Sequence, residues 1–144
     1  MPYCTQSDIL EQLDSEILAQ LADDAGTGSA DASAVVERAI ADADSEIDAY
    51  CGRRYTVPFA AVPGIIRKLS VDIAIYHLYG RRAAGDVPDG RKGRYGNAVR
   101  LLEHISKGLV TLGGLDPGGN PPSVEKPTLS ADERLYGRSK MMGY

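Results

Sequence analysis

The clearest structural pattern in the chain is a stretch of 22 residues, DASAVVERAIADADSEIDAYCG, at positions 31–52. Its apolar residues recur at spacings of three and four, the period of one face of an α-helix. They are Val36, Ala39, Ile40, Ala43, Ile47 and Tyr50. Asp31 or Ser33 can cap the start, and Gly52 interrupts the pattern. The stretch therefore predicts a long amphipathic helix.

Helical signals also precede this stretch. Thr5 and Asp8 have the spacing of a capping box, and apolar residues at helical spacing continue from there to Leu21. This pattern predicts either one helix or two short helices with a break near Asp14 and Ser15.

On the C-terminal side, apolar spacing predicts a helix over residues 64–80 and another from about Arg94 to Lys107. Between them, residues 81–93 are basic and rich in Gly, which predicts a flexible loop. The predicted fold class is therefore all-α, a compact bundle of about four main helices. A short β-capable run follows at residues 109–112.

The composition changes after Gly114. Leu, Ile, Val and Phe make up only 4 of the 30 residues from 115 to 144, compared with 28 of the first 114. A stretch so poor in apolar residues cannot compensate for its own ordering entropy, and four prolines prevent a continuous helix. We therefore divide the chain into a helical domain at 1–114 and an extended Gly/Pro-rich C-terminal arm at 115–144.

The last ten residues are again apolar and basic, which predicts that the arm docks on a partner. The expected anchors are Leu135, Tyr136, Met141 and Tyr144.

Length and composition limit the class of protein. A chain of 144 residues is one domain's worth, and Leu, Ile, Val and Phe together number only 32, with no Trp. A hydrophobic core with so few large apolar residues favours oligomerisation, in which further apolar surface is buried against another subunit. No apolar run is long enough to span a membrane and the start lacks a signal peptide, so we expect a soluble intracellular protein without membrane contact.

Charge is strongly segregated along the chain. Residues 1–50 carry twelve acidic side chains and one basic one, a net charge of −11, whereas residues 51–107 carry eleven basic and four acidic ones, a net charge of +7. The two regions could pair within one monomer, pair head to tail between copies, or leave the basic half to contact a polyanion such as DNA. The candidate subunit-interface residues are Asp42, Asp44, Asp48, Arg53 and Arg54. The candidate phosphate-facing residues are Arg91, Lys92 and Arg94.

Motifs for enzyme chemistry or cofactors are missing from the sequence. Cys4, Cys51, His77 and His104 stand alone, without the paired spacing of a zinc site, and two cysteines are too few for a disulfide framework. The acidic stretch after Ala22 lacks the ligand positions of a calcium loop, and GRKGRYG from Gly90 matches no phosphate-binding motif. We therefore expect no metal, no cofactor and no catalytic residues.

Four segments together resemble a known family. They are YCTQSDIL from Tyr3, ERAIADADSEIDAYCGRRYTVPF with VPGIIRKLSVDIAIYHLYGRR, RYGNAVRLLEHISKGLVTLG, and the terminal RLYGRSKMMGY. The chain resembles the Mu-like phage family of small head-tail joining proteins, the gp36-like family. The resemblance implies a helical head-tail connector, or adaptor, which forms a homo-oligomeric ring beneath the portal protein, around the DNA channel. It implies neck or tail-completion proteins as further partners, weak non-specific contact with packaged DNA, and a place in the virion neck after assembly in the host cytoplasm.

The alternative function is a small phage or prophage DNA-binding regulator, in which the basic half would contact phosphates. The acidic half opposes this interpretation because it would weaken non-specific affinity, and the sequence contains no evident DNA-reading helix.

Overall fold

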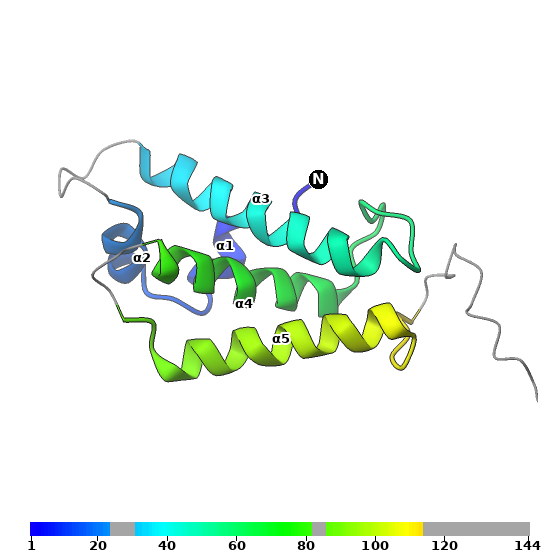
Figure 1. The fold of residues 1–144 in the computed structure, drawn as a ribbon. Coiled ribbons are helices and arrows are strands. Elements are labelled where there is room, and N and C mark those ends of the chain that lie inside the picture. Colours follow the sequence, from blue (N-terminus) through cyan, green and yellow to red (C-terminus); the bar gives the residue numbers. More distant parts are fainter. Residues whose placement is uncertain (24–30, 82–85, 114–144) are drawn as a thin grey trace, which may run out of the picture.

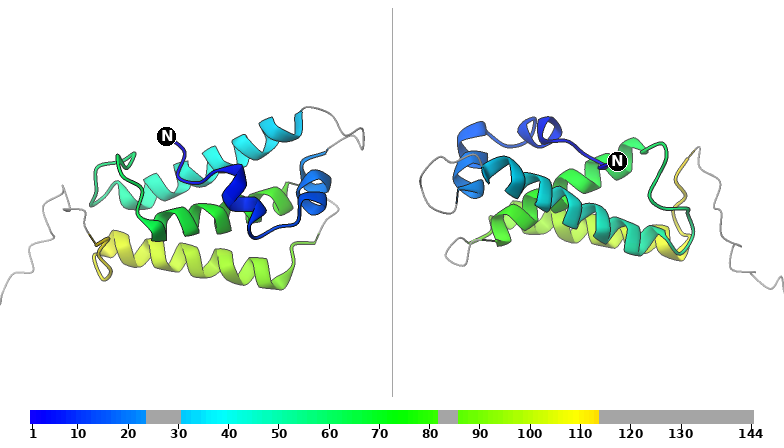
Figure 2. Two further views of the ribbon diagram at one scale, coloured as in Figure 1. Left: turned by 180° about the vertical axis from the view of Figure 1, so that it is seen from behind. Right: turned by 90° about the horizontal axis from the view of Figure 1, so that it is seen from above.

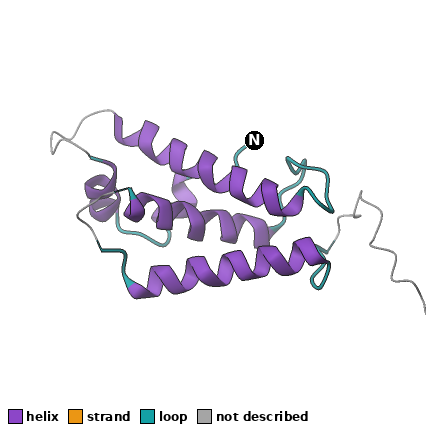
Figure 3. Ribbon diagram, viewed as in Figure 1, coloured by secondary structure: helices purple, strands orange, loops and turns teal. Residues whose placement is uncertain are grey.

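The computed structural model describes residues 1–23, 31–81 and 86–113. They form five helices: α1 (Gln6–Leu10), α2 (Ser15–Ala22), α3 (Asp31–Cys51), α4 (Gly64–Gly80) and α5 (Asp89–Lys107) (Figure 1). These described parts of the chain contain no strand (Figure 3). The predicted all-α fold is confirmed. The predicted arm at 115–144 lies outside the described residues.

The long helices α3, α4 and α5 pack side by side, with each antiparallel to the one before it (Figure 1). The short helices α1 and α2 lie behind them and cover α4, and α2 also contacts α3 (Figure 2). As a result, α4 is the central helix, in contact with all four of the others.

Burial follows from this arrangement. The stripe predicted for α3 is confirmed, since Val36, Ala43 and Ile47 are at most 1% exposed. Helix α4 is covered on more sides than α3, although Ile65 in its first turn is 39% exposed. The same packing buries two polar residues, Ser70 and Asp72. The buried apolar residues of α4 are Ile66, Leu69, Val71, Ile73, Ala74, Ile75 and Leu78.

Of the two alternatives for the N-terminal pattern, one helix or two short ones, the structure forms two short helices. The side chain of Thr5 accepts a hydrogen bond from the Asp8 backbone N–H, and the Asp8 carboxylate accepts one from the Thr5 N–H at 2.7 Å. This capping box satisfies two backbone donors that a helix start leaves without partners. The chain then breaks after Leu10, and α2 begins at Ser15.

The prediction of a flexible loop over residues 81–93 was wrong in its second half. Helix α5 begins at Asp89 rather than Arg94, so the whole GRKGRYG run is helical. Each helical Gly costs about 1 kcal/mol relative to Ala, which is why the local pattern indicated a loop. Here Asp89 favours the helix start electrostatically, and Arg91 and Arg94 donate hydrogen bonds to Gln12 in the turn between α1 and α2. These tertiary contacts offset the intrinsic cost.

The β-capable run at 109–112 does not form a strand either. Within the described residues no second strand is available to pair with it. Instead, the backbone N–H of Leu112 donates a hydrogen bond of 2.9 Å to the Tyr55 hydroxyl, and the Leu112 side chain is buried. The run therefore closes the end of the bundle as irregular chain.

Gly108 ends α5 in a conformation that requires glycine. Its φ is +79°, and a Cβ added there would lie 1.8 Å from Nη1 of Arg54, which packs over it. We expect Gly108→Ala to lower the free energy of unfolding by at least about 1–2 kcal/mol, because an L-residue is disfavoured in the left-handed region and Arg54 must also move. Chemical denaturation would measure this.

Gly93→Ala is the matched control, because Gly93 is helical and a Cβ there would meet no atom within 4 Å. This substitution should raise stability, by up to about 1 kcal/mol. Equal effects of the two substitutions would contradict the assigned role of Gly108.

Candidate functional site

Two of the acidic interface candidates, Asp44 and Asp48, hold the N-terminal segment in place. Asp44 accepts hydrogen bonds from the Tyr3 backbone N–H at 2.9 Å and from the Ser70 hydroxyl at 2.8 Å. The Tyr3 hydroxyl donates to Asp48 and accepts from the Phe59 N–H at 3.1 Å. These carboxylates on α3 therefore face a buried polar cluster inside the monomer.

Burial controls the ionisation of this polar cluster. Desolvation raises the pKa of Asp44, although the hydrogen bonds from Tyr3 and Ser70 act in the opposite direction. Desolvation and then the hydrogen bond to Asp48 raise the pKa of the Tyr3 hydroxyl. Both shifts favour the neutral form of the group. The sequence analysis missed Tyr3 as a core residue, because a lone aromatic residue before the first helix belongs to no periodic pattern.

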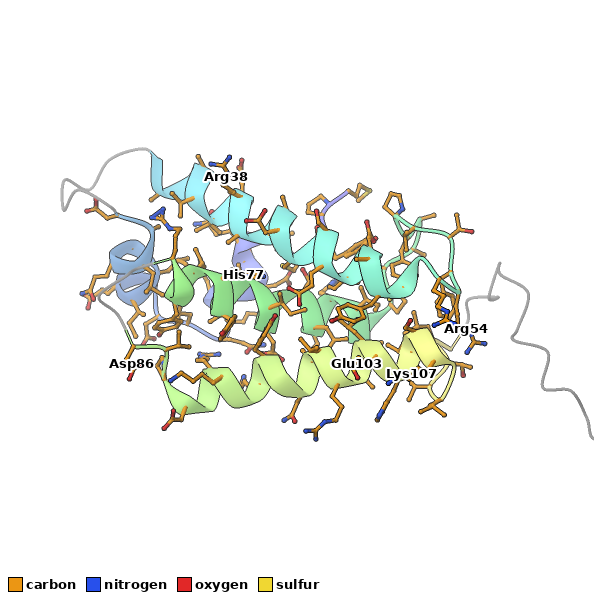
Figure 4. All side chains as sticks on the ribbon, in the orientation of Figure 1. Arg38, Arg54, His77, Asp86, Glu103 and Lys107 are labelled. Atoms are coloured by element: carbon orange, nitrogen blue, oxygen red, sulfur yellow. The ribbon has the colours of Figure 1, made fainter. Side chains whose placement is uncertain are left out.

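The remaining interface candidates differ in accessibility. Asp42 and Arg53 are exposed. Arg54 is only partly exposed and packs against Gly108 at the end of the bundle where α5 ends (Figure 4). Its position beside the last carbonyls of α5 is electrostatically favourable for a cation. Asp42 and Arg53 are therefore the best placed of the five to contact another molecule. The arm candidates Leu135, Tyr136, Met141 and Tyr144 lie outside the described residues.

The candidate phosphate-facing residues all contact groups of the same chain. Arg91 donates to the Gln12 backbone carbonyl at 2.9 Å, and Arg94 donates to the Gln12 side chain at 2.8 Å. Nη1 of Arg94 also lies 3.7 Å from the buried Asp72 carboxylate.

Lys92 is engaged in a similar way. Its Nζ lies 3.3 Å from an Asp86 oxygen and 3.7 Å from an Asp89 oxygen, and the hydrogen bond to Asp86 is the main reason that the pKa of Lys92 is raised. The exposed bases that form no ion pair in the described part of the chain are Arg38, Arg53, Arg67, Lys68 and Arg100. Arg54 and Arg91 are also without a carboxylate partner there, but both are only partly exposed.

A second polar cluster joins the three long helices. Glu46 of α3 accepts hydrogen bonds from the Tyr95 hydroxyl of α5 at 3.0 Å and from Nε2 of His77 of α4 at 3.2 Å. Tyr95 also stacks on Tyr76, with ring centroids 4.0 Å apart and planes within 6°. Burial, followed by the hydrogen bond to Glu46, raises the pKa of Tyr95 to about 12. The cluster ties α3, α4 and α5 together, and no sequence pattern pointed to it.

Comparison with known proteins assigns this helical chain to a family. The sequence model of the family described as Bacteriophage Mu, Gp36 matches residues 3–131. The chain belongs to the Mu Gp36 family. The resemblance found in the sequence is thereby confirmed, and the protein is a phage protein.

Two relatives of this Gp36-family chain show how far the similarity extends. The Mu-like prophage FluMu protein gp36 of Haemophilus influenzae is 28% identical over 142 residues, which cover 99% of this chain and 97% of the relative. Gene product J of Escherichia phage Mu is 25% identical over 113 residues, 74% of each protein.

Both cysteines of the Gp36-family chain are buried. Cys4 and Cys51 are free thiols at most 1% exposed, and burial raises the pKa of each to about 11. Among the described residues, no group of three or more His, Cys, Asp and Glu could hold a metal ion. In the same part of the chain, none of the helices combines the length and apolar character needed to cross a membrane.

The surface of this Gp36-family protein is hollowed by several grooves. One of about 700 Å³ lies between α3 and α4, one of about 560 Å³ between the N-terminal segment and α3, and one of about 380 Å³ between α4 and α5. They differ in the charge of their linings, which determines what each can bind.

Proposed function

We propose that the protein is a structural virion protein, a head-tail connector that forms a ring beneath the portal and around the DNA channel. The observation that carries this proposal is membership of a phage Mu family over residues 3–131, in a small helical protein of the kind that the resemblance implies. Its partners would be further copies of itself, the portal protein, and neck or tail-completion proteins. It would assemble in the host cytoplasm and remain in the virion neck.

The distribution of exposed charge supports a head-to-tail contact between copies. Five exposed acids lie in the turn between α1 and α2, on α2 and on α3, namely Glu11, Asp14, Glu16, Glu37 and Asp42. Exposed bases without an ion pair follow later in the chain, namely Arg53, Arg67, Lys68 and Arg100. Exposed acids and bases carried by different segments of one molecule suit a heterologous interface, which closes into a ring when the rotation permits.

Electron microscopy of the full-length protein, alone and with its cognate portal, tests the proposal directly. We expect rings with a central channel, either alone or on the portal. A protein that stays monomeric with the portal present and does not bind it would contradict the connector function.

A charge exchange tests the contact between copies. Asp42→Arg and Arg53→Glu should each weaken assembly, because each places like charges in every subunit interface. One exposed pair is worth about 1 kcal/mol or less, but the loss is repeated around a ring. The double variant should recover assembly in part, as measured by sedimentation velocity.

Arg38→Glu is the control for this charge exchange. Arg38 is an exposed base on the acidic helix α3, so its reversal should leave assembly unchanged or strengthen it. Unaltered sedimentation of both single variants under assembling conditions would rule out the proposed contact.

The alternative function, a DNA-binding regulator, rests on the exposed bases Arg67, Lys68 and Arg100. A connector should bind DNA weakly, without sequence preference, and less as salt rises, because only phosphates would be contacted. A fluorescence anisotropy titration that shows tight binding to one sequence at physiological salt would favour the regulator.

A further inference from the structure

The groove between the N-terminal segment and α3 combines apolar walls with negative charge. Its volume is about 560 Å³. Pro2 and Cys4 form part of one wall, Ile40 and Ala41 part of the other, and two carboxylates, Glu37 and Asp44, also line it.

Neither carboxylate in this groove forms an ion pair within the described chain. Glu37 is exposed and forms no hydrogen bond there either. Asp44 is half-buried and accepts hydrogen bonds from the neutral Tyr3 N–H and Ser70 hydroxyl; no basic side chain lies within 4.0 Å, and the N-terminal ammonium group acts on it only from a longer distance. A ligand that fits must therefore carry both apolar side chains and positive charge.

The other two grooves select a ligand less clearly or select the opposite charge. The groove between α3 and α4 has Arg38 and Arg81 as well as Asp42 at its lining, so charge favours no particular ligand. The groove between α4 and α5 is lined by Lys68, Arg94 and Asp72, and Asp72 lies 3.7 Å from Arg94, so it offers a basic segment no unpaired carboxylate.

The chain itself contains a segment with the required chemistry. Residues 135–144, LYGRSKMMGY, hold five large apolar or aromatic side chains and two bases, with no acid. Twenty-one residues separate this segment from Gly113, the last described residue, and they can span about 70 Å when extended. Reach is therefore no obstacle to docking on the same or a neighbouring molecule.

We infer that the groove between the N-terminal segment and α3 binds residues 135–144 of this chain. Met or Tyr side chains would cover the exposed lining residues Pro2 and Ala41, while Arg138 or Lys140 would approach Glu37 and Asp44. This contact goes beyond the proposed function. The groove and the segment can pair within one molecule or between two copies, whether or not a ring forms.

Disulfide cross-linking in the full-length protein tests the inference. Ala41 is exposed in the groove, so an Ala41→Cys/Met141→Cys variant should form a disulfide under mild oxidation. Cys4 and Cys51 should not compete, because they are buried and their pKa values of about 11 keep them as thiols. A monomeric cross-linked product would assign the groove to the same copy, and a covalent oligomer would assign it to a neighbour. Both products support the pairing.

Ala19→Cys/Met141→Cys is the matched control, because Ala19 is exposed on α2 and does not line the groove. Its cross-linking yield should be several-fold lower. Equal yields for the two pairs would overturn the inference.

Charge variants in the cross-linking background provide the second measurement. Glu37→Lys should lower the yield about two- to fivefold, the range for one exposed ion pair, and adding Arg138→Glu and Lys140→Glu should restore it. Glu16→Lys, an equal charge change at an exposed site on α2, should have no effect. If Glu16→Lys and Glu37→Lys lower the yield equally, the groove does not select the segment by charge and the inference fails. Circular dichroism of each variant verifies that the helices are intact.

Discussion

Replacing Tyr3 by Ala should lower the free energy of unfolding by about 3–5 kcal/mol, the usual cost of removing a large buried aromatic side chain. Tyr3 is only 2% exposed, and its ring packs against Phe59 with centroids 5.5 Å apart. Its hydroxyl also joins Asp48 on α3 to the Phe59 backbone N–H. The N-terminal segment is therefore part of the core, although it precedes the first helix.

Tyr3→Phe is the control that separates packing from hydrogen bonding. It keeps the ring but leaves the Phe59 N–H and the Asp48 carboxylate without their partner, at a cost of about 1–3 kcal/mol. Urea denaturation of both variants measures the difference. If Tyr3→Ala lowers the free energy of unfolding by less than about 1 kcal/mol, the N-terminal segment does not contribute substantially to the stability of the bundle.

Asp44→Ala should be among the most destabilising changes at a polar residue. It leaves the buried Tyr3 N–H without an acceptor, at a cost of about 1–3 kcal/mol, and it leaves the Ser70 hydroxyl with only the weak acceptor Cys4 Sγ, 3.1 Å away. Asp44→Asn should be tolerated at pH 7, because its amide oxygen can accept from Tyr3 while its N–H donates to Ser70. The substitution also removes a desolvated charge.

The same position should make stability depend on pH. Burial raises the pKa of Asp44 in the folded protein above its ordinary value of 3.8. Above about pH 4 the Asp44 carboxyl is ionised in the unfolded chain but keeps its proton in the folded protein up to a higher pH. Between these two pKa values, the free energy of unfolding decreases as pH rises. The free energy of unfolding of the natural chain should therefore fall with rising pH relative to that of Asp44→Asn. If the free energy of unfolding of the natural chain instead rises with pH relative to that of Asp44→Asn, the folded state favours the charged carboxylate of Asp44.

The predictions that succeeded rest on local physics. The stripe from Val36 to Ile47, the capping box of Thr5 and Asp8, and the break before Ser15 depend on residues within one or two turns of each other. Helical periodicity and backbone capping act over this range, so the positions and order of the main helices could be predicted from the sequence, although the choice between one and two N-terminal helices remained open. Similarity to the Mu Gp36 family was also visible in the sequence.

The placement of charge was not local. Asp44 and Asp48 lie on α3 with the spacing of a solvent-facing stripe, but Tyr3, more than 40 residues earlier in the chain, turns their carboxylates inward. Arg91 and Arg94 are paired with Gln12, about 80 residues away.

Helix periodicity was therefore enough to predict the all-α class and the order of the main helices. The tertiary structure alone revealed which charges face inward, that α5 extends through its Gly-rich start, and where Glu46 meets His77 and Tyr95. The physical reason is that a charged side chain costs little in water and becomes buried only where a distant segment supplies its hydrogen bonds. The identity of that distant segment is a property of the packed bundle and is not encoded in any short stretch of the sequence.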